Sequence, residues 1–220
     1  MQLLGWTAPG GSEELALACG QSGGPRLLVL PAWFDEGNKL RHMTVEAMRS
    51  LERLGVASVM PDLPGCNESV APLDLQTLAT WQSAAAAAAS HLACTHVLVV
   101  RAAANIAPDL PGWAWAPLAG KSALRALLRA RVIASKEAGA PETSDALLEQ
   151  GKAHGLDLAG YRLGAAMVAG LAEAELPATA LTPIAQDDLG GPGLWLRAEP
   201  EHDPSQAKAL ARFIAAEMTA

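Results

Sequence analysis

Short apolar runs bounded by turn residues recur along the first half of the chain. The runs at residues 26–30, 56–60 and 96–100 are rich in leucine and β-branched residues, which predicts three buried strands. Between the first two strands, apolar residues at helical spacing predict a helix over residues 38–54, and a second helix is predicted over residues 73–92. This alternation, with strands that are apolar throughout, indicates a parallel sheet covered by helices on both faces.

The flanking segments add edge strands and further helices to this pattern. Residues 14–19 alternate between apolar and polar positions, which predicts an antiparallel edge strand that pairs with residues 3–6. The other predicted elements are strands at 113–118 and 193–197, helices at 121–136 and 204–218, and a helix, or a strand leading into one, at 158–174. No internal repeat or linker interrupts the chain, so we expect one domain over residues 1–220.

Composition excludes several classes of protein. Half of the 220 residues are hydrophobic and 18% are charged, which rules out a disordered chain, and the net charge of -7 argues against nucleic-acid binding. The N-terminal residues lack the basic and apolar regions of a signal peptide, and no run is apolar over the ~18–20 residues of a membrane span. Cys19, Cys66 and Cys94 are odd in number and widely spaced, which favours reduced thiols. We expect a cytoplasmic protein with no transmembrane segment, nucleic-acid partner, metal site or cofactor.

Four segments carry motifs that occur together in a known group of proteins. They are PAWFDEGNKLRHM at 31–43, PDLPGCNES at 61–69, WAPLAGKSALRALLRARV at 115–132 and LAGY at 158–161. In this order they resemble the motifs E-x-N-K-S-R-R-M, D-L-x-G-C-G-x-S, W-x-P-x-x-G-x-x-x-L-x-x-x-L-R and V-A-G-Y. These belong to the second class of hydrolase-like proteins associated with the exosortase A system. Leu40 and His42 depart from the first motif, and Asn67 replaces a glycine of the second.

The resemblance implies an α/β fold of the α/β-hydrolase type. Such a fold has a mostly parallel sheet with helices on both faces, here with a reduced cap. The resemblance also implies a bacterial setting, because these proteins accompany genes for exopolysaccharide production and for sorting proteins to the cell envelope. The pattern D-x-x-G-x-x-x-S from Asp62 to Ser69 is itself common after the fourth strand of α/β hydrolases.

The residue expected to act as nucleophile is missing. An active α/β hydrolase carries Ser, Cys or Asp on a strained turn after its fifth strand, within G-x-S-x-G. After residues 96–100 this chain has Arg101 instead, followed by alanines. Arginine stays protonated and cannot attack an acyl group. The leading hypothesis is therefore a degenerate hydrolase-fold protein that serves an exopolysaccharide- or exosortase-associated system as an accessory or ligand-binding component.

The alternative hypothesis is a hydrolase or acyl-transfer enzyme that acts on small acyl substrates. Cys66 lies in a glycine-containing loop at the carboxyl end of a strand and is a candidate nucleophile if a nearby cation lowers its pKa. Otherwise it is a small side chain that shapes the loop. His202 follows the last predicted strand, where the catalytic histidine of the fold is expected, or it is a solvated loop histidine. Asp187 and Asp188 are the candidates for the acid.

Polar and charged side chains gather after the first buried strand. They are Glu36, Asn38, Lys39 and Arg41, and the predicted topology brings Arg101 near them. Lys39, Arg41 and Arg101 together would suit a phosphate or carboxylate. Alternatively, Glu36 pairs with Arg101 or Arg41 and fills the vacant site. The expected partner is a small anionic ligand or a protein of the same pathway.

Two further patterns each have a functional and a structural interpretation. Lys121, Arg125 and Arg129 recur every four residues and form a basic helix face, which either docks an acidic partner or membrane surface or is only solvated. Trp113 and Trp115 point the same way from a predicted strand, where they either pack in the core or line a carbohydrate-binding wall.

Overall fold

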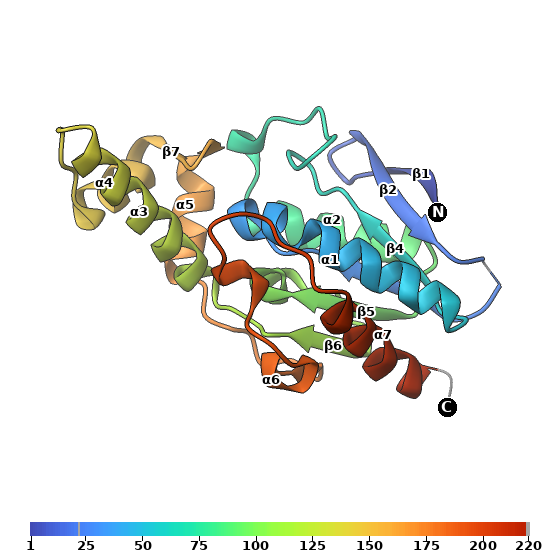
Figure 1. Cartoon of the computed structure of the whole chain (residues 1–220). Helices are drawn as coiled ribbons and strands as arrows, with labels where there is room; N and C mark the ends of the chain where they lie inside the picture. Colours follow the sequence, from blue (N-terminus) through green and yellow to red (C-terminus); the bar gives the residue numbers. More distant parts are fainter. Residues whose placement is uncertain (22, 219–220) are drawn as a thin grey trace.

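The computed structural model describes residues 1–21 and 23–218. At its centre is a seven-stranded sheet with the strand order β1-β2-β4-β3-β5-β6-β9 (Figure 1). The strands are β1 (Gln2–Thr7), β2 (Glu13–Cys19), β3 (Arg26–Leu30), β4 (Ala57–Pro61), β5 (His96–Val100), β6 (Gly112–Trp115) and β9 (Thr182–Ile184). β1 and β2 form an antiparallel hairpin at one edge, and β2 runs antiparallel to β4. The remaining strands are parallel, so the sheet is mostly parallel as predicted.

Helices cover both faces of the sheet. α1 (Phe34–Arg53) and α7 (Pro204–Met218) pack together on one face, and α2 (Leu78–His91) lies on the other. Alternate residues of β3 enter the two cores: Leu27 and Val29 pack below α1 and α7, whereas Leu28 and Leu30 pack below α2. Because both faces are buried, the central strands are apolar at most positions, the exceptions being Arg26, Ser58 and His96, and the sequence shows nearly continuous apolar runs there.

Between β6 and β9 the chain leaves the sheet and forms a small cap. The cap consists of α3 (Gly120–Glu137), α4 (Ser144–His154), the hairpin of β7 (Leu156–Leu158) and β8 (Tyr161–Leu163), and α5 (Ala165–Glu173). Figure 1 shows these elements grouped beside the sheet at the left of the view. A short helix, α6 (Gln186–Leu189), follows β9. Within residues 1–21 and 23–218, no helix has both the length and the apolar character that crossing a bilayer requires.

Several predicted elements are wrong or shifted. The strand predicted at 193–197 is a short 3-10 helix, Leu194–Leu196, and the last parallel strand is β9 instead. In a strand Leu194 and Leu196 would point to the same face, but Leu194 is buried while Leu196 is 75% exposed, so this short apolar run does not mark a strand. The helix predicted at 73–92 begins only at Leu78, after a 3-10 turn at Leu73–Leu75, because Thr77 caps it: its side chain accepts a hydrogen bond from the Thr80 backbone amide.

Candidate functional site

Between β3 and β5, the connections to successive strands change from one side of the sheet to the other. From β3 the connection through α1 leads to β4 on one side, and from β4 the connection through α2 leads back to β5 on the other. In open α/β sheets, ligands bind in the crevice beyond the carboxyl ends of the strands at such a point. The segments that meet there are the loop before α1, Arg101 after β5, and the loop at 62–69 after β4, which we call the β4 loop.

Three neighbouring strand ends lead into left-handed backbone. φ is 54° at Phe34 after β3, 56° at Arg101 after β5 and 43° at Ala116 after β6. Residues with a side chain seldom adopt this conformation, and where it occurs the surrounding contacts must hold it. At Arg101 the chain turns sharply into a 3-10 helix (Arg101–Ile106), and the Leu118 amide donates a hydrogen bond to the Arg101 carbonyl at 3.2 Å. The backbone after β5 therefore retains a strained turn.

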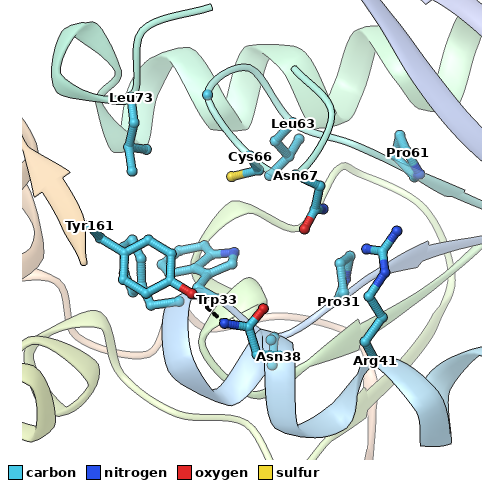
Figure 2. Close-up of a pocket in the computed structure, with 14 residues that line it drawn as sticks. Pro31, Trp33, Asn38, Arg41, Pro61, Leu63, Cys66, Asn67, Leu73 and Tyr161 are labelled. Carbon is cyan, nitrogen blue, oxygen red and sulfur yellow. Dashed lines mark hydrogen bonds between the residues drawn. The ribbon is translucent and has the colours of Figure 1, made fainter. Parts of the chain in front are cut away.

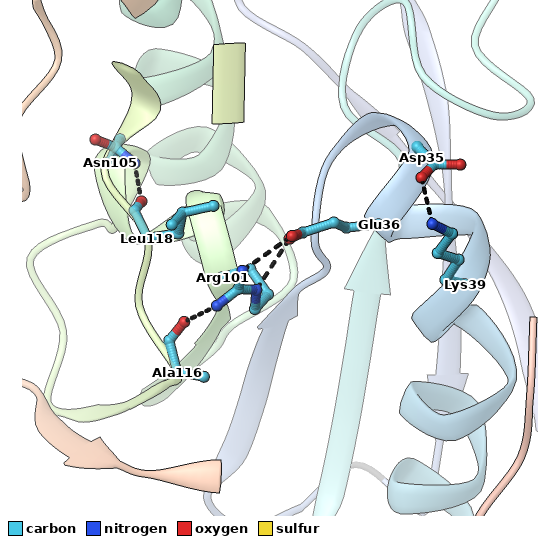
Figure 3. Close-up of polar contacts among 7 residues, drawn as sticks. All are labelled: Asp35, Glu36, Lys39, Arg101, Asn105, Ala116 and Leu118. Atoms are coloured by element: carbon cyan, nitrogen blue, oxygen red, sulfur yellow. Dashed lines mark hydrogen bonds and ion pairs between the residues drawn. The ribbon is translucent and has the colours of Figure 1, made fainter. Parts of the chain in front are cut away.

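Hydrogen bonds hold the Arg101 side chain in this crevice (Figure 3). Its Nε and Nη2 atoms donate to the two carboxylate oxygens of Glu36, at 3.0 and 2.9 Å, and its Nη1 donates to the Ala116 carbonyl at 2.9 Å. The guanidinium carbon lies 4.1 Å from the centroid of the Trp195 ring, and the Arg101 side chain is only 11% exposed. Paired hydrogen bonds to a carboxylate and stacking on an aromatic ring are the two contacts that a guanidinium makes best.

The residues that the sequence grouped as an anion site separate into three sets. Glu36 pairs with Arg101, and Lys39 forms an ion pair with Asp35 one helical turn away, with Nζ 2.7 Å from Oδ2. Asn38 and Arg41 lie on another face of α1, where they line a separate cavity. Lys39 and Arg101 are thus already neutralised by carboxylates, whereas Arg41 has no carboxylate within ion-pair distance among the described residues.

This cavity lies between α1, the β4 loop and the β7–β8 hairpin and has a volume of about 90 Å³ (Figure 2); we call it the Arg41 cavity. Asn38 Nδ2 donates to the Tyr161 hydroxyl at 2.8 Å, and Asn67 Nδ2 donates to Asp62 Oδ1 at 2.7 Å. The apolar wall consists mainly of Trp33, Phe34, Leu63 and Leu73. The cavity thus joins one cation and two amide groups to an aromatic wall.

The titratable neighbours of this cavity are shifted by burial. Burial raises the pKa of Asp62, and the hydrogen bond from Asn67 and the charge of Arg41 oppose that shift only in part. Burial likewise raises the pKa of Tyr161, against the opposing effect of the hydrogen bond from Asn38. The Tyr161 phenol is therefore protonated at neutral pH and retains its own proton for donation.

Cys66 lines the same cavity, but its environment suppresses the thiolate. Burial raises its pKa to about 12, and the negative charges of Asp62 and Glu14 add to the shift. A reactive cysteine needs the opposite, a lowered pKa from a neighbouring cation. The cations proposed from sequence do not supply it, because the pKa shift of Cys66 contains no contribution from Arg41 or Arg101.

We expect Cys66 to react very slowly with iodoacetamide at pH 8. Raising the pKa from 9.0 to about 12 lowers the thiolate fraction about a thousandfold, so alkylation should be slower by about that factor than in the unfolded chain. The rate should rise about tenfold for each pH unit, because the thiolate is the reacting species. Mass spectrometry of each cysteine in native and urea-unfolded protein measures this, and equal rates in the two states would contradict the buried thiol.

The other candidate catalytic residues lie apart from the Arg41 cavity. His202 stacks on His42 of α1, with ring centroids 4.0 Å apart, and neither histidine lines the cavity. Asp188 accepts a hydrogen bond from the Ala185 amide at 2.7 Å and so closes the first turn of α6. Cys66 and His202 thus share no contact among the described residues. Residues 1–21 and 23–218 contain no cluster of side chains that could hold a metal ion.

A second cavity of about 320 Å³ lies between the start of α1 and helix α3. Its lining is rich in alanine, with Ala102 after the Arg101 turn and Ala123, Ala126 and Ala130 from α3. Trp33 and Phe34 line both cavities and form the wall between them. Space is therefore present beside the strained turn, with mostly apolar walls and with Asp35, Glu36 and Lys39 along one side.

Some important residues were missed by sequence reasoning. Trp195 lies in the segment that was predicted as a strand, so its contact with Arg101 had no signal in the pattern. Tyr161 is the single tyrosine of the chain and lies in the LAGY motif, which was the only available signal.

Trp113 and Trp115 are buried, and their indole nitrogens donate to Glu217 and Gln186, so they belong to the core and not to a binding wall.

The predicted basic face on α3 is partly neutralised. Lys121 forms an ion pair with Glu175, whereas Arg125 and Arg129 are exposed. Arg131 donates two hydrogen bonds to Glu142, from Nε at 2.6 Å and from Nη2 at 3.1 Å. Exposed arginines that form no ion pair with the described residues are typical of a solvated surface and do not by themselves indicate a partner.

No protein-family model and no curated protein matches this sequence. Solved structures do: a protein of Agrobacterium vitis assigned as a hydrolase is 18% identical, with a TM-score of 0.52 over 99% of this chain and 98% of its own. A proline iminopeptidase-related protein of Thermus thermophilus is 23% identical, with a TM-score of 0.47 over 60% of this chain. An esterase of Exiguobacterium antarcticum is 18% identical, with a TM-score of 0.43 over 57% of this chain. This chain spans 51% and 54% of the lengths of the latter two.

The full-length similarity and the mostly parallel sheet with helices around it show that the chain has the α/β-hydrolase fold. In that fold the nucleophile lies on a strained turn between a strand and a helix. Arg101 is at that turn, directly after β5.

Proposed function

We propose that this protein is a degenerate α/β-hydrolase that lacks the usual nucleophile and binds a small anionic ligand. One observation carries the proposal: at the turn after β5, the Arg101 guanidinium is bound by Glu36, the Ala116 carbonyl and Trp195. A guanidinium neither attacks an acyl group nor takes up a proton from a nucleophile at neutral pH. Held in this way, Arg101 acts as a structural residue at the centre of the former catalytic crevice.

The ligand-binding part of the proposal concerns the residues after β3. Asn38 and Arg41 line the Arg41 cavity, and Arg41 is the cation of this group that the described residues leave without an ion pair. Glu36, Lys39 and Arg101 support this region through their own ion pairs. A half-buried arginine that forms no ion pair attracts a carboxylate or phosphate more strongly than a solvated one does, because its charge is less screened.

The proposed setting is a bacterial exopolysaccharide or exosortase-associated system, where the protein would act in the cytoplasm as a single-domain accessory component. This part rests on the resemblance of the motifs at 31–43, 61–69, 115–132 and 158–161 to the exosortase-associated group. Gel filtration of the protein mixed with candidate proteins of such a system tests the association. Separate elution of every pair at micromolar concentration would count against it.

Ester hydrolysis tests the loss of catalysis. With p-nitrophenyl acetate and butyrate, we expect the purified protein to give no more product than the same amount of its Cys66→Ala variant. The reason is that Arg101 cannot act as a nucleophile and that burial raises the pKa of Cys66 to about 12. An active esterase assayed in parallel is the positive control. A burst of p-nitrophenol that Cys66→Ala abolishes would overturn the proposal in favour of a hydrolase or acyl-transfer enzyme with Cys66 as the nucleophile.

A further inference from the structure

The amide groups in the Arg41 cavity have fixed orientations. Asn67 Nδ2 donates to the Asp62 carboxylate, and a carboxylate only accepts, so Asn67 Oδ1 faces the opening. Asn38 Nδ2 donates to Tyr161, and Asn38 Oδ1 accepts no hydrogen bond from the described residues. Figure 2 shows both amide oxygens directed into the space between the two residues. The cavity therefore presents two acceptors that a ligand can satisfy only with a donor.

Donors lie at the sides of the same space. The guanidinium of Arg41 has five N–H groups and makes no hydrogen bond to the described residues. The hydroxyl of Tyr161 accepts from Asn38 and can donate its own proton toward the cavity. A matching ligand thus carries an anionic acceptor group for Arg41 and, next to it, a donor for the amide oxygens.

The size of the cavity limits the rest of the ligand. At about 90 Å³ it holds more than a single water and suits a compact organic group of a few non-hydrogen atoms. Trp33, Phe34, Leu63 and Leu73 form an apolar wall, which suits a short alkyl group and not a second charge.

We propose that the Arg41 cavity binds a short α-hydroxy carboxylic acid. The carboxylate would pair with Arg41, the hydroxyl would donate to the oxygen of Asn67 or Asn38, and the alkyl group would pack on Trp33 and Phe34. An α-amino acid fits less well, because an ammonium group loses more hydration free energy than a hydroxyl does and is repelled by Arg41. The inference rests on the proposed function, since it names the ligand of the same site.

Calorimetric titration with four ligands of similar size tests the inference. We expect lactate to bind more tightly than propionate, lactamide and alanine by about tenfold or more. Propionate lacks the hydroxyl, lactamide lacks the negative charge, and alanine has an ammonium group in place of the hydroxyl. If propionate binds as tightly as lactate, the hydroxyl inference is overturned while anion binding stands. If neither acid binds, the inference and the anionic-ligand part of the proposed function both fail.

Two variants separate the roles of charge and hydroxyl recognition. Arg41→Gln should weaken lactate binding by about tenfold or more, whereas Arg125→Gln on the exposed face of α3 should leave it unchanged. Asn67→Gly suits the left-handed backbone at that position, where φ is 48°. It should lower the affinity for lactate toward that for propionate and leave propionate binding as it was. Unchanged lactate binding in Arg41→Gln, or an equal loss for both acids in Asn67→Gly, would overturn the inference.

Discussion

Replacing Glu36 with glutamine is expected to lower the free energy of unfolding by about 2 kcal/mol. The substitution removes the counter-charge of Arg101, whose side chain is 11% exposed and cannot turn to water without leaving Trp195 and the Ala116 carbonyl. Breaking a fully buried pair by removing one partner costs about 3–5 kcal/mol, and the 23% exposure of Glu36 reduces that figure here. Urea denaturation followed by circular dichroism measures the change.

A double-mutant cycle isolates the pair from its surroundings. With Glu36→Gln, Arg101→Gln and the double variant, we expect a coupling energy of about 1–3 kcal/mol. The matched control is Glu149→Gln, which removes the exposed pair with Lys152 and should change the stability by less than about 0.5 kcal/mol. A loss in Glu36→Gln no larger than in this control would show that the Glu36–Arg101 pair does not stabilise the fold.

Replacing Trp81 with alanine should be still more damaging, with an expected loss of about 3–5 kcal/mol. Trp81 is completely buried in α2, and its ring lies 5.0 Å from that of Trp33 and 6.0 Å from that of Phe34. Its Nε1 atom also donates to the Pro64 carbonyl at 2.9 Å, which fastens the β4 loop to the helix. The substitution therefore creates a void next to Trp33 and Phe34, which separate the two cavities. It also removes the hydrogen bond that holds the β4 loop, which carries Cys66 and Asn67.

Trp81→Phe separates these two contributions. It keeps most of the apolar volume and loses the hydrogen bond to Pro64, so we expect a loss of about 1–2 kcal/mol and faster proteolysis within the β4 loop. Gln82→Ala, at the exposed neighbouring position of the same helix, should stay within about 0.5 kcal/mol of the wild type. If Trp81→Phe is as stable and as resistant to protease as the wild type, the hydrogen bond does not hold the loop.

The central sheet could be predicted because strands that are buried on both faces appear in the sequence as short apolar runs. β3 and β5 have the predicted bounds, and β4 differs from its prediction by one residue at each end. β9 could not be predicted in the same way. It has the sequence Thr-Pro-Ile, and its proline is tolerated because the strand is at the edge of the sheet, a fact of tertiary structure.

The site was harder to predict than the sheet. Glu36 and Arg101 are 65 positions apart in the sequence. They lie together because β3 and β5 are neighbours in the sheet, so the predicted strand order was enough to bring them near each other. Asn38 and Tyr161 are 123 positions apart, and their contact depends on how the cap hairpin lies against α1. That packing leaves no periodic trace in the sequence. The position of Trp195 over Arg101 could not be predicted for the same reason. The 3-10 helix that contains Trp195 has no characteristic pattern of apolar residues.

The strained backbone at Arg101 also makes this chain a useful starting point for enzyme engineering. A left-handed turn after a central strand is the part of a nucleophile elbow that side-chain substitution cannot create, because it depends on the whole sheet and on the segments that pack around it. Here the turn is already built, and a mostly apolar cavity of about 320 Å³ lies beside it. A designer would have to add a nucleophile at position 101 and a general base in place of Glu36, and to restore the stability that the Glu36–Arg101 pair contributes.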